Sequence, residues 1–219
     1  MFGFQPTTFA TQAALPTDPW DPLTAVFMQT DASFSADNSV SIPAGAQVGD
    51  LIVAIRLANN ITGEPNITGG TAGYSLVYLE SDDRQACVII WKIAAASDAG
   101  GGSITFDLAT ENWAEITACF RKSTAFSNMS VALTSASSSA PSITPASKSL
   151  GIVGVISDDA GAAFASFNNG YATTTTKALA GGGGQMIAGY KVLAAAVASG
   201  IVTPNVVSPT QSAFHLAFN

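Results

Sequence analysis

The residue types that perform acid–base and metal chemistry are scarce in this chain. Its 219 residues include one His and two Cys, and 11% of them are charged. The single imidazole, that of His215, lies in the alternating C-terminal run Phe-His-Leu-Ala-Phe, and the sequence contains no Gly-x-Ser-x-Gly nucleophile elbow. One imidazole cannot build a His-rich zinc site, and a lone His in a terminal strand is usually structural. We therefore expect no catalytic residue, no bound metal and no cofactor.

Carboxylates could still supply chemistry, since a glycosidase needs only two of them. The six candidates for such an acid–base pair are Glu80, Asp82, Asp83, Asp107, Glu111 and Glu115. Half of them lie in turn-like segments, where acidic side chains usually serve local capping and solubility. The Asp pairs at 82–83 and 158–159 could also bind Ca²⁺, but neither follows the alternating-acid loop of a specific site. We expect a non-enzymatic protein.

Neither the glycine run nor the cysteines of the chain point to catalysis. The run Gly-Gly-Gly-Gly-Gln at 181–185 lacks the Lys-Ser/Thr of a phosphate-binding loop, so we expect a flexible turn there. Cys87 and Cys119 each lie inside an apolar, strand-like run. Such surroundings favour two packed thiols over the alternative, a cross-strand disulfide.

Aromatic rings could bind sugars, because a flat ring on a sheet face is a suitable platform for a pyranose. Trp91 follows three aliphatic residues and is expected in the core. Trp113, which follows Thr-Glu-Asn, and Tyr74 are the candidate glycan contacts. The sequence leaves both interpretations of these two rings open, core packing and a carbohydrate-binding face.

The elements that would position these residues are short strands. Apolar runs rich in Val, Ile, Thr and aromatics alternate with turn clusters, and no amphipathic helical stretch intervenes. This pattern predicts an all-β, antiparallel β-sandwich or jelly-roll-like fold. Residues 51–55 and 88–91 are apolar at every position and predict central strands covered on both faces. About eleven strands are expected, at 24–30, 38–42, 50–58, 74–80, 85–95, 103–108, 113–121, 128–136, 149–157, 185–194 and 212–218, with weaker candidates at 171–176 and 201–207.

Residues 1–23 differ from the rest of the chain. Four rings, those of Phe2, Phe4, Phe9 and Trp20, are interleaved with prolines, without a sustained period of 2 or 3.6. Large rings are costly to leave in water, so we expect an extended N-terminal arm that docks on a partner.

Residues 24–219 are expected to form a single β-sandwich domain. The Ser- and Pro-rich stretch 137–145 resembles a linker, but it leads at once into the apolar run that starts at residue 150. We therefore expect this stretch to cross between two sheets of one domain.

The charge balance excludes two classes of partner. The net charge is −7, and the 8 Lys and Arg residues are not clustered, which argues against nucleic acid and against an anionic membrane surface. No apolar run approaches the roughly 20 residues of a membrane-spanning helix. The N-terminus has no basic region followed by an apolar one, so we expect no secretory signal and synthesis in a cytoplasm.

Two segments resemble a known module. Residues 40–54 read Val-Ser-Ile-Pro-Ala-Gly-Ala-Gln-Val-Gly-Asp-Leu-Ile-Val-Ala, and residues 88–94 read Val-Ile-Ile-Trp-Lys-Ile-Ala. In this pattern a Pro-Ala-Gly turn leads through Gly-Asp into an apolar strand, and a later strand ends in an aromatic residue, a basic residue and Ala. The pattern resembles a β-sandwich module of tailed-bacteriophage virion proteins. The similarity covers about residues 38–125, and related modules also occur in some bacterial surface proteins.

The resemblance implies a virion structural protein, either head-decorating or tail- or fibre-associated. Its expected partners are other virion proteins, of the capsid or the tail, and copies of itself. Its expected location is the virion, after synthesis in the host cytoplasm. The competing hypothesis is a carbohydrate-binding β-sandwich module for host-surface recognition, with a glycan receptor bound at Tyr74 or Trp113.

Overall fold

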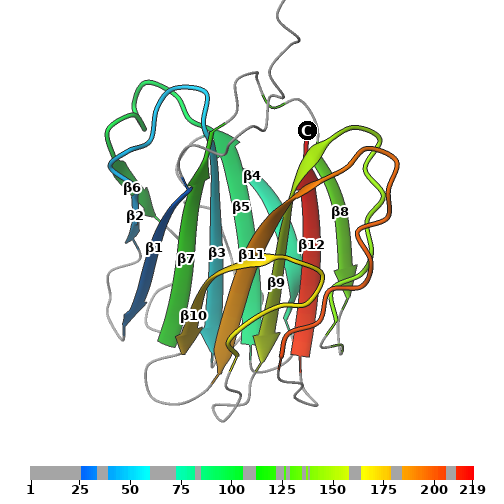
Figure 1. The fold of residues 1–219 in the computed structure, drawn as a ribbon. Coiled ribbons are helices and arrows are strands. Elements are labelled where there is room, and N and C mark those ends of the chain that lie inside the picture. Colours follow the sequence, from blue (N-terminus) through cyan, green and yellow to red (C-terminus); the bar gives the residue numbers. More distant parts are fainter. Residues whose placement is uncertain are drawn as a thin grey trace, which may run out of the picture.

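The computed structural model of the chain describes residues 26–33, 39–59, 73–81, 85–105, 112–121, 126, 129–134, 137, 139–157, 164–178, 184–205 and 211–219 (Figure 1). This part of the chain is all-β and antiparallel, and it contains no helix that could cross a membrane. Its strands are β1 (Val26–Ser33), β2 (Ser39–Ile42), β3 (Leu51–Asn59), β4 (Ser75–Ser81), β5 (Gln85–Ile93), β6 (Gly102–Thr105), β7 (Asn112–Phe120), β8 (Met129–Thr134), β9 (Ser149–Ser157), β10 (Ala172–Ala178), β11 (Gln185–Leu193) and β12 (Gln211–Phe218).

The described strands form two five-stranded sheets and a two-stranded ribbon. The first sheet has the order β1-β7-β3-β5-β4, the second has the order β10-β11-β9-β12-β8, and the ribbon pairs β2 with β6. The first sheet and the ribbon therefore use strands up to β7, and the second sheet uses only strands from β8 onward (Figure 1). The chain passes from one sheet to the other between β7 and β8.

The two sheets share an apolar core. Alternate residues of β3, namely Leu51, Val53 and Ile55, are at most 4% exposed and belong to the same buried cluster as Phe214 and Leu216 of β12. Because successive side chains of a strand point to opposite faces, this cluster places one face of each sheet against the other.

The outer face of the first sheet is covered as well. Ile52 and Ala54, which point away from the shared core, pack with Ile42 and Ile104 of the ribbon in a second cluster. This arrangement explains why β3 is apolar at every position, and it confirms the prediction that residues 51–55 form a central strand covered on both faces.

Connecting segments cover the outer face of the second sheet. Val153 and Val155 of β9 pack there with Ile143, Phe167 and Val202, which lie in the segments that follow β8, precede β10 and follow β11. All five side chains are at most 9% exposed. Strand β9 is therefore buried on both faces, and the connections of the second sheet form an outer layer over it.

The prediction that stretch 137–145 crosses between two sheets is wrong. The stretch joins β8 to β9, and these two strands lie in the same sheet with β12 between them. Its apolar residues Ala140 and Ile143 are buried against the outer face of that sheet. An apolar outer face needs a cover, and this segment supplies part of it.

Gly154, in the middle of β9, makes room for an aromatic ring. Its register partner on β12 is Phe214, and a Cβ atom built on Gly154 would lie 2.2 Å from two atoms of that ring. Because no side chain tolerates such a distance, only glycine lets the ring of Phe214 lie over β9 in the shared core.

The predicted runs coincide with strands to within a few residues, and the weaker candidate at 171–176 is β10. Residues 201–205, the described part of the other weaker candidate at 201–207, form isolated bridges only, from Val202 to Ala140 and from Pro204 to Phe167. Proline cannot donate to a ladder, which limits pairing there. The expected arm at 1–23 and the glycines at 181–183 lie outside the described residues.

Candidate functional site

The two predicted glycan contacts lie far apart on the first sheet. Ser75, the residue after Tyr74, pairs with Trp91 of β5. Trp91 pairs in turn with Val53 of β3, and Val53 pairs with Ala118 of β7. Trp113 lies five residues further along β7, roughly 17 Å away at about 3.3 Å per residue. The structure therefore does not bring Tyr74 and Trp113 together on one sugar platform. The side chain of Trp113 lies outside the described residues.

Tyr74 and Trp91 are both packed against apolar clusters. The ring of Tyr74 contacts the cluster beneath the ribbon, and its buried hydroxyl has no hydrogen-bond partner among the residues that the structure describes. Trp91 packs against the shared core, with its ring centroid 5.4 Å from that of Phe218 in an edge-to-face arrangement. Trp91, which was predicted in the core, is partly buried and packs against it, and the buried hydroxyl of Tyr74 is poorly placed to bind a glycan.

Two residues of the predicted acid–base set, Glu80 and Glu115, have a described backbone, and their side chains lie outside the described residues. Glu80 lies on the edge strand β4 and Glu115 on β7, which is separated from β4 by β5 and β3. Three strand spacings of about 4.8 Å place their backbones roughly 14 Å apart, so the two residues are not cross-strand neighbours. The other four carboxylates and the pair at 158–159 lie outside the described residues.

Cys119 is a buried free thiol, as expected for the packed-thiol interpretation. Cys87 is in register with Leu57 of β3, whereas Cys119 is in register with Ile52 of the same strand. The two cysteines therefore lie on opposite sides of β3 and five residues apart along it. A disulfide requires Cα atoms within about 7 Å, so these residues cannot be bridged.

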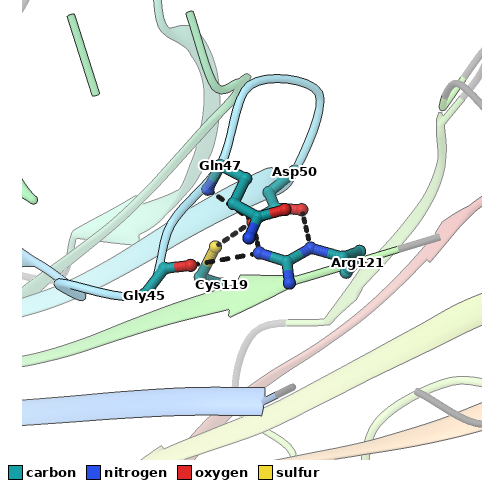
Figure 2. Close-up of polar contacts among 5 residues, drawn as sticks. All are labelled: Gly45, Gln47, Asp50, Cys119 and Arg121. Atoms are coloured by element: carbon teal, nitrogen blue, oxygen red, sulfur yellow. Dashed lines mark hydrogen bonds and ion pairs between the residues drawn. The ribbon is translucent and has the colours of Figure 1, made fainter. Parts of the chain in front are cut away.

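A carboxylate clamp lies at the start of β3 (Figure 2). Asp50 accepts two hydrogen bonds from the guanidinium of Arg121, at 2.8 and 2.7 Å, and one at 2.8 Å from the backbone N–H of Gln47. The thiol of Cys119 lies 3.5 Å from the same carboxylate, and Arg121 also donates to the carbonyl of Gly45. We call these five residues the Asp50 clamp. It fastens the turn before β3 to the end of β7.

The electrostatics of the Asp50 clamp suit a permanent ion pair. Burial alone would raise the pKa of Asp50, but the hydrogen bonds from Arg121 and Gln47 hold it below its ordinary value. Burial, together with the neighbouring carboxylate, raises the pKa of the Cys119 thiol to about 12. A thiol that stays protonated and buried is a poor nucleophile. The Asp50 clamp is therefore equipped to hold a turn and not to attack a substrate.

A second carboxylate secures the neighbouring turn in the same way. Asp98 accepts a hydrogen bond at 2.7 Å from the N–H of Ala95 and forms an ion pair at 2.7 Å with Lys92 of β5. The Nζ atom of Lys92 also lies 4.6 Å from the ring centroid of Tyr74, a cation–π distance. The contact occupies one face of the ring that was predicted to bind a glycan.

The two carboxylate-bound turns are hydrogen-bonded to each other. The N–H of Gly49 donates to the carbonyl of Ala94 at 2.9 Å, and the N–H of Ala94 donates to the carbonyl of Asp50 at 2.7 Å. The N–H of Gly100 reaches the carbonyl of Ala46 at 2.9 Å. This end of the first sheet is thus a rigid block whose described charges are paired internally.

His215 is completely buried and joins three segments. Its Nδ1 atom lies 2.9 Å from the carbonyl oxygen of Pro141, which can only accept, so Nδ1 carries the proton. Nε2 then accepts a hydrogen bond at 2.6 Å from the hydroxyl of Tyr171. Burial lowers the pKa of His215. A neutral imidazole with both nitrogens bonded and no exposed surface is a structural residue.

An open hollow of about 370 Å³ lies on the outer layer of the second sheet. Two antiparallel segments form it, and they are joined by backbone hydrogen bonds from Asn168 to Thr203 and from Asn205 to Ser166. We call this feature the asparagine hollow. Its lining residues are Ser166, Phe167, Asn168, Thr203, Pro204 and Asn205.

The asparagine hollow could not be predicted from the sequence. Asn168 belongs to an Asn-Asn-Gly run at 168–170, which by itself predicts only a turn, and Asn205 carries no signal of its own. The available signal was the pair of Asn residues beside two short polar segments, but the hollow exists only because residues about 35 positions apart are bridged, as in the contact of Phe167 with Pro204.

Among the described residues, no three His, Cys, Asp or Glu side chains gather as a metal site would require. No protein-family model, no curated protein and no solved structure matches the chain.

Proposed function

We propose that this chain is a structural protein of a tailed-bacteriophage virion, either head-decorating or tail- or fibre-associated. In this proposal residues 1–23 anchor the protein on capsid or tail proteins or on copies of itself, and the β-domain is presented on the particle. Synthesis takes place in the host cytoplasm, and the protein acts without catalysis or a cofactor.

The observation that carries the proposal is the way the two resembling segments meet. Residues 40–54 run from the ribbon through the Asp50 clamp into β3, and residues 88–94 run along β5 to Ala94. The Gly49-Asp50 pair of the first segment and the terminal Ala94 of the second exchange two backbone hydrogen bonds. Residues that are distant in sequence thus form one unit, which supports a shared module over a chance similarity of two short strings.

The architecture that we infer is a β-sandwich. Two antiparallel sheets with a common apolar core support this assignment, and the number of described strands is close to the expected eleven. The order of strands favours a sandwich over a jelly roll, because a jelly roll distributes successive strands between both sheets. Here β1–β7 and β8–β12 are segregated.

The polar groups of the described residues also favour a structural role. Asp50, Asp98 and His215 are each at most 3% exposed and are bonded to backbone or cationic partners that hold turns in place. General acid–base catalysis needs titratable groups within reach of a substrate. These three groups are committed to the fold.

The anchoring role of the arm is tested by removing its rings from the full-length chain. We would replace Phe2, Phe4, Phe9 and Trp20 with Ser and measure particle incorporation and, by light scattering, the mass in solution. The expected result is loss of incorporation, with any full-length oligomer reduced to monomer. A matched control replaces four Thr residues of residues 1–23 with Ser and keeps the rings. Unchanged mass and unchanged incorporation in the ring variant would refute the arm as the anchor.

The alternative is a carbohydrate-binding module used in host-surface recognition. The distance between Tyr74 and Trp113 speaks against a single platform built from these two rings, and the cation over Tyr74 occupies one of its faces. A glycan array would separate the hypotheses. Specific binding that is lost in Trp113→Ala would favour recognition at the predicted ring. Stable self-assembly without any binding that depends on Trp113 would favour the structural role.

A further inference from the structure

We propose that the asparagine hollow binds an uncharged, hydroxyl-rich ligand, namely a sugar unit of a glycan. The site is independent of the proposed virion role, because it uses neither the arm nor the two segments that carry the resemblance. It also differs in place from Tyr74 and Trp113, which lie on the first sheet, whereas the asparagine hollow lies on the outer layer of the second sheet.

The walls of the asparagine hollow are rigidly built. The N–H of Asn168 donates to the carbonyl of Thr203 at 3.1 Å, and the N–H of Asn205 donates to the carbonyl of Ser166 at 2.9 Å. Between these two bonds the side chain of Phe167 is 9% exposed and packs into the cluster beneath, close to the backbone of Gly189. A preformed wall loses little conformational entropy when a ligand binds.

Hydrogen bonding fixes the orientation of both asparagine amides. The side chain of Asn168 accepts a hydrogen bond at 2.9 Å from the N–H of Thr203. The side chain of Asn205 accepts two, from the N–H groups of Ala165 at 2.6 Å and Ser166 at 2.9 Å. Because a backbone N–H can only donate, the accepting atom must be the amide oxygen in each case. The amide nitrogen of Asn168, a donor, therefore lies on the other arm of an exposed side chain.

The chemistry of the lining selects the class of ligand. None of the six lining residues is charged, so the asparagine hollow has no cation to select phosphate or carboxylate. Amide and hydroxyl groups that both donate and accept match the hydroxyls of a sugar. The two apolar lining residues, Phe167 and Pro204, are buried and expose little surface to a ligand. The volume of about 370 Å³ lies at the lower end of the range of small-molecule sites.

Two variants test the site without removing its framework. Asn168→Asp keeps an oxygen to accept the N–H of Thr203 but exchanges the amide donor for an acceptor. Ser166→Trp fills the hollow from an exposed position whose backbone bonds are kept. Ser130→Asp, on the exposed face of β8, is the control for the added negative charge. Thermal unfolding of each full-length variant checks that the fold is retained.

The probe is a printed array of neutral mono- and oligosaccharides that includes bacterial surface sugars, followed by calorimetric titration of the sugars that bind. We expect the native chain to bind at least one neutral sugar, with the Kd raised at least tenfold in Asn168→Asp and in Ser166→Trp and unchanged in Ser130→Asp. The proposal is overturned if the native chain binds no sugar on the array. It is also overturned if binding survives in folded Ser166→Trp, or is abolished only by Trp113→Ala.

Discussion

Replacing Arg121 with Met tests whether the Asp50 clamp stabilises the fold through charge. The variant keeps an aliphatic stem and removes both hydrogen bonds to Asp50, whose side chain is 3% exposed, whereas that of Arg121 is 28% exposed. Breaking a fully buried pair costs about 3–5 kcal/mol and an exposed one about 0.2–1 kcal/mol. With one partner buried and the other partly hydrated, we expect a loss of about 2–3 kcal/mol at pH 7.

The loss should shrink as the pH falls. In the native protein the folded pKa of Asp50 is lowered, so the stabilisation is present above the unfolded pKa of about 3.9 and disappears as the pH drops through the folded value. In Arg121→Met the burial of Asp50 remains while the guanidinium is gone, so its folded pKa rises and the charged form destabilises the variant at neutral pH. The difference between the two proteins is therefore largest near pH 7 and smallest near pH 3.

Urea unfolding of native protein, Asp50→Asn, Arg121→Met and the double variant, each at pH 7 and pH 4, measures these quantities. The two single changes should be non-additive by at least about 1 kcal/mol at pH 7, because they remove the same interaction. A difference between native and Arg121→Met that does not depend on pH, or a coupling below about 0.5 kcal/mol, would show that the carboxylate and guanidinium hold the turn by packing alone.

Three further outcomes are expected. Gly154→Ala should lower the unfolding free energy by about 1–3 kcal/mol, because the new methyl group would overpack against the ring of Phe214. Gly102→Ala is the control. Its new Cβ would have only contacts of at least 3.5 Å, so it should cost less in the same urea titration. Burial lowers the folded pKa of His215, so the stability that depends on its neutral form should be complete above about pH 6.5 and should fall as the pH drops toward the folded pKa. A urea midpoint that is equal at pH 7.5 and pH 5.5 would contradict this. Cys119 should resist iodoacetamide at pH 8 in the folded protein. After unfolding without reductant, two thiols should react, and a count below two would indicate a disulfide that the strand register forbids.

The strands could be predicted from the sequence because their signals are local. A run such as 51–55, apolar at every position and bounded by Gly49-Asp50, identifies a central strand without knowledge of its neighbours. The pairing of strands is not local. Stretch 137–145 was assigned to a crossing between sheets because nothing in its composition reveals that β12 lies between β8 and β9.

The candidate site was less predictable, for the same reason. Asp50 could be recognised as part of a Gly-Asp turn, but its partner Arg121 is 71 positions away and carried no signal of its own. Asn168 has the composition of a turn whether or not another segment lies beside it. A pattern of residue types predicts which groups are present, and only long-range pairing decides which of them meet.

The segregation of early strands in one sheet and late strands in the other has a consequence for synthesis. When β7 has left the ribosome, the first sheet and its ribbon have all their strands, but the face that carries Leu51, Val53 and Ile55 has no cover until β9, β11 and β12 are made. At roughly 5–20 residues per second, the remaining 100 or so residues take about 5–20 s. During that interval each nascent chain exposes an apolar sheet face, so chains translated close together on one message risk pairing with each other before their own second halves arrive.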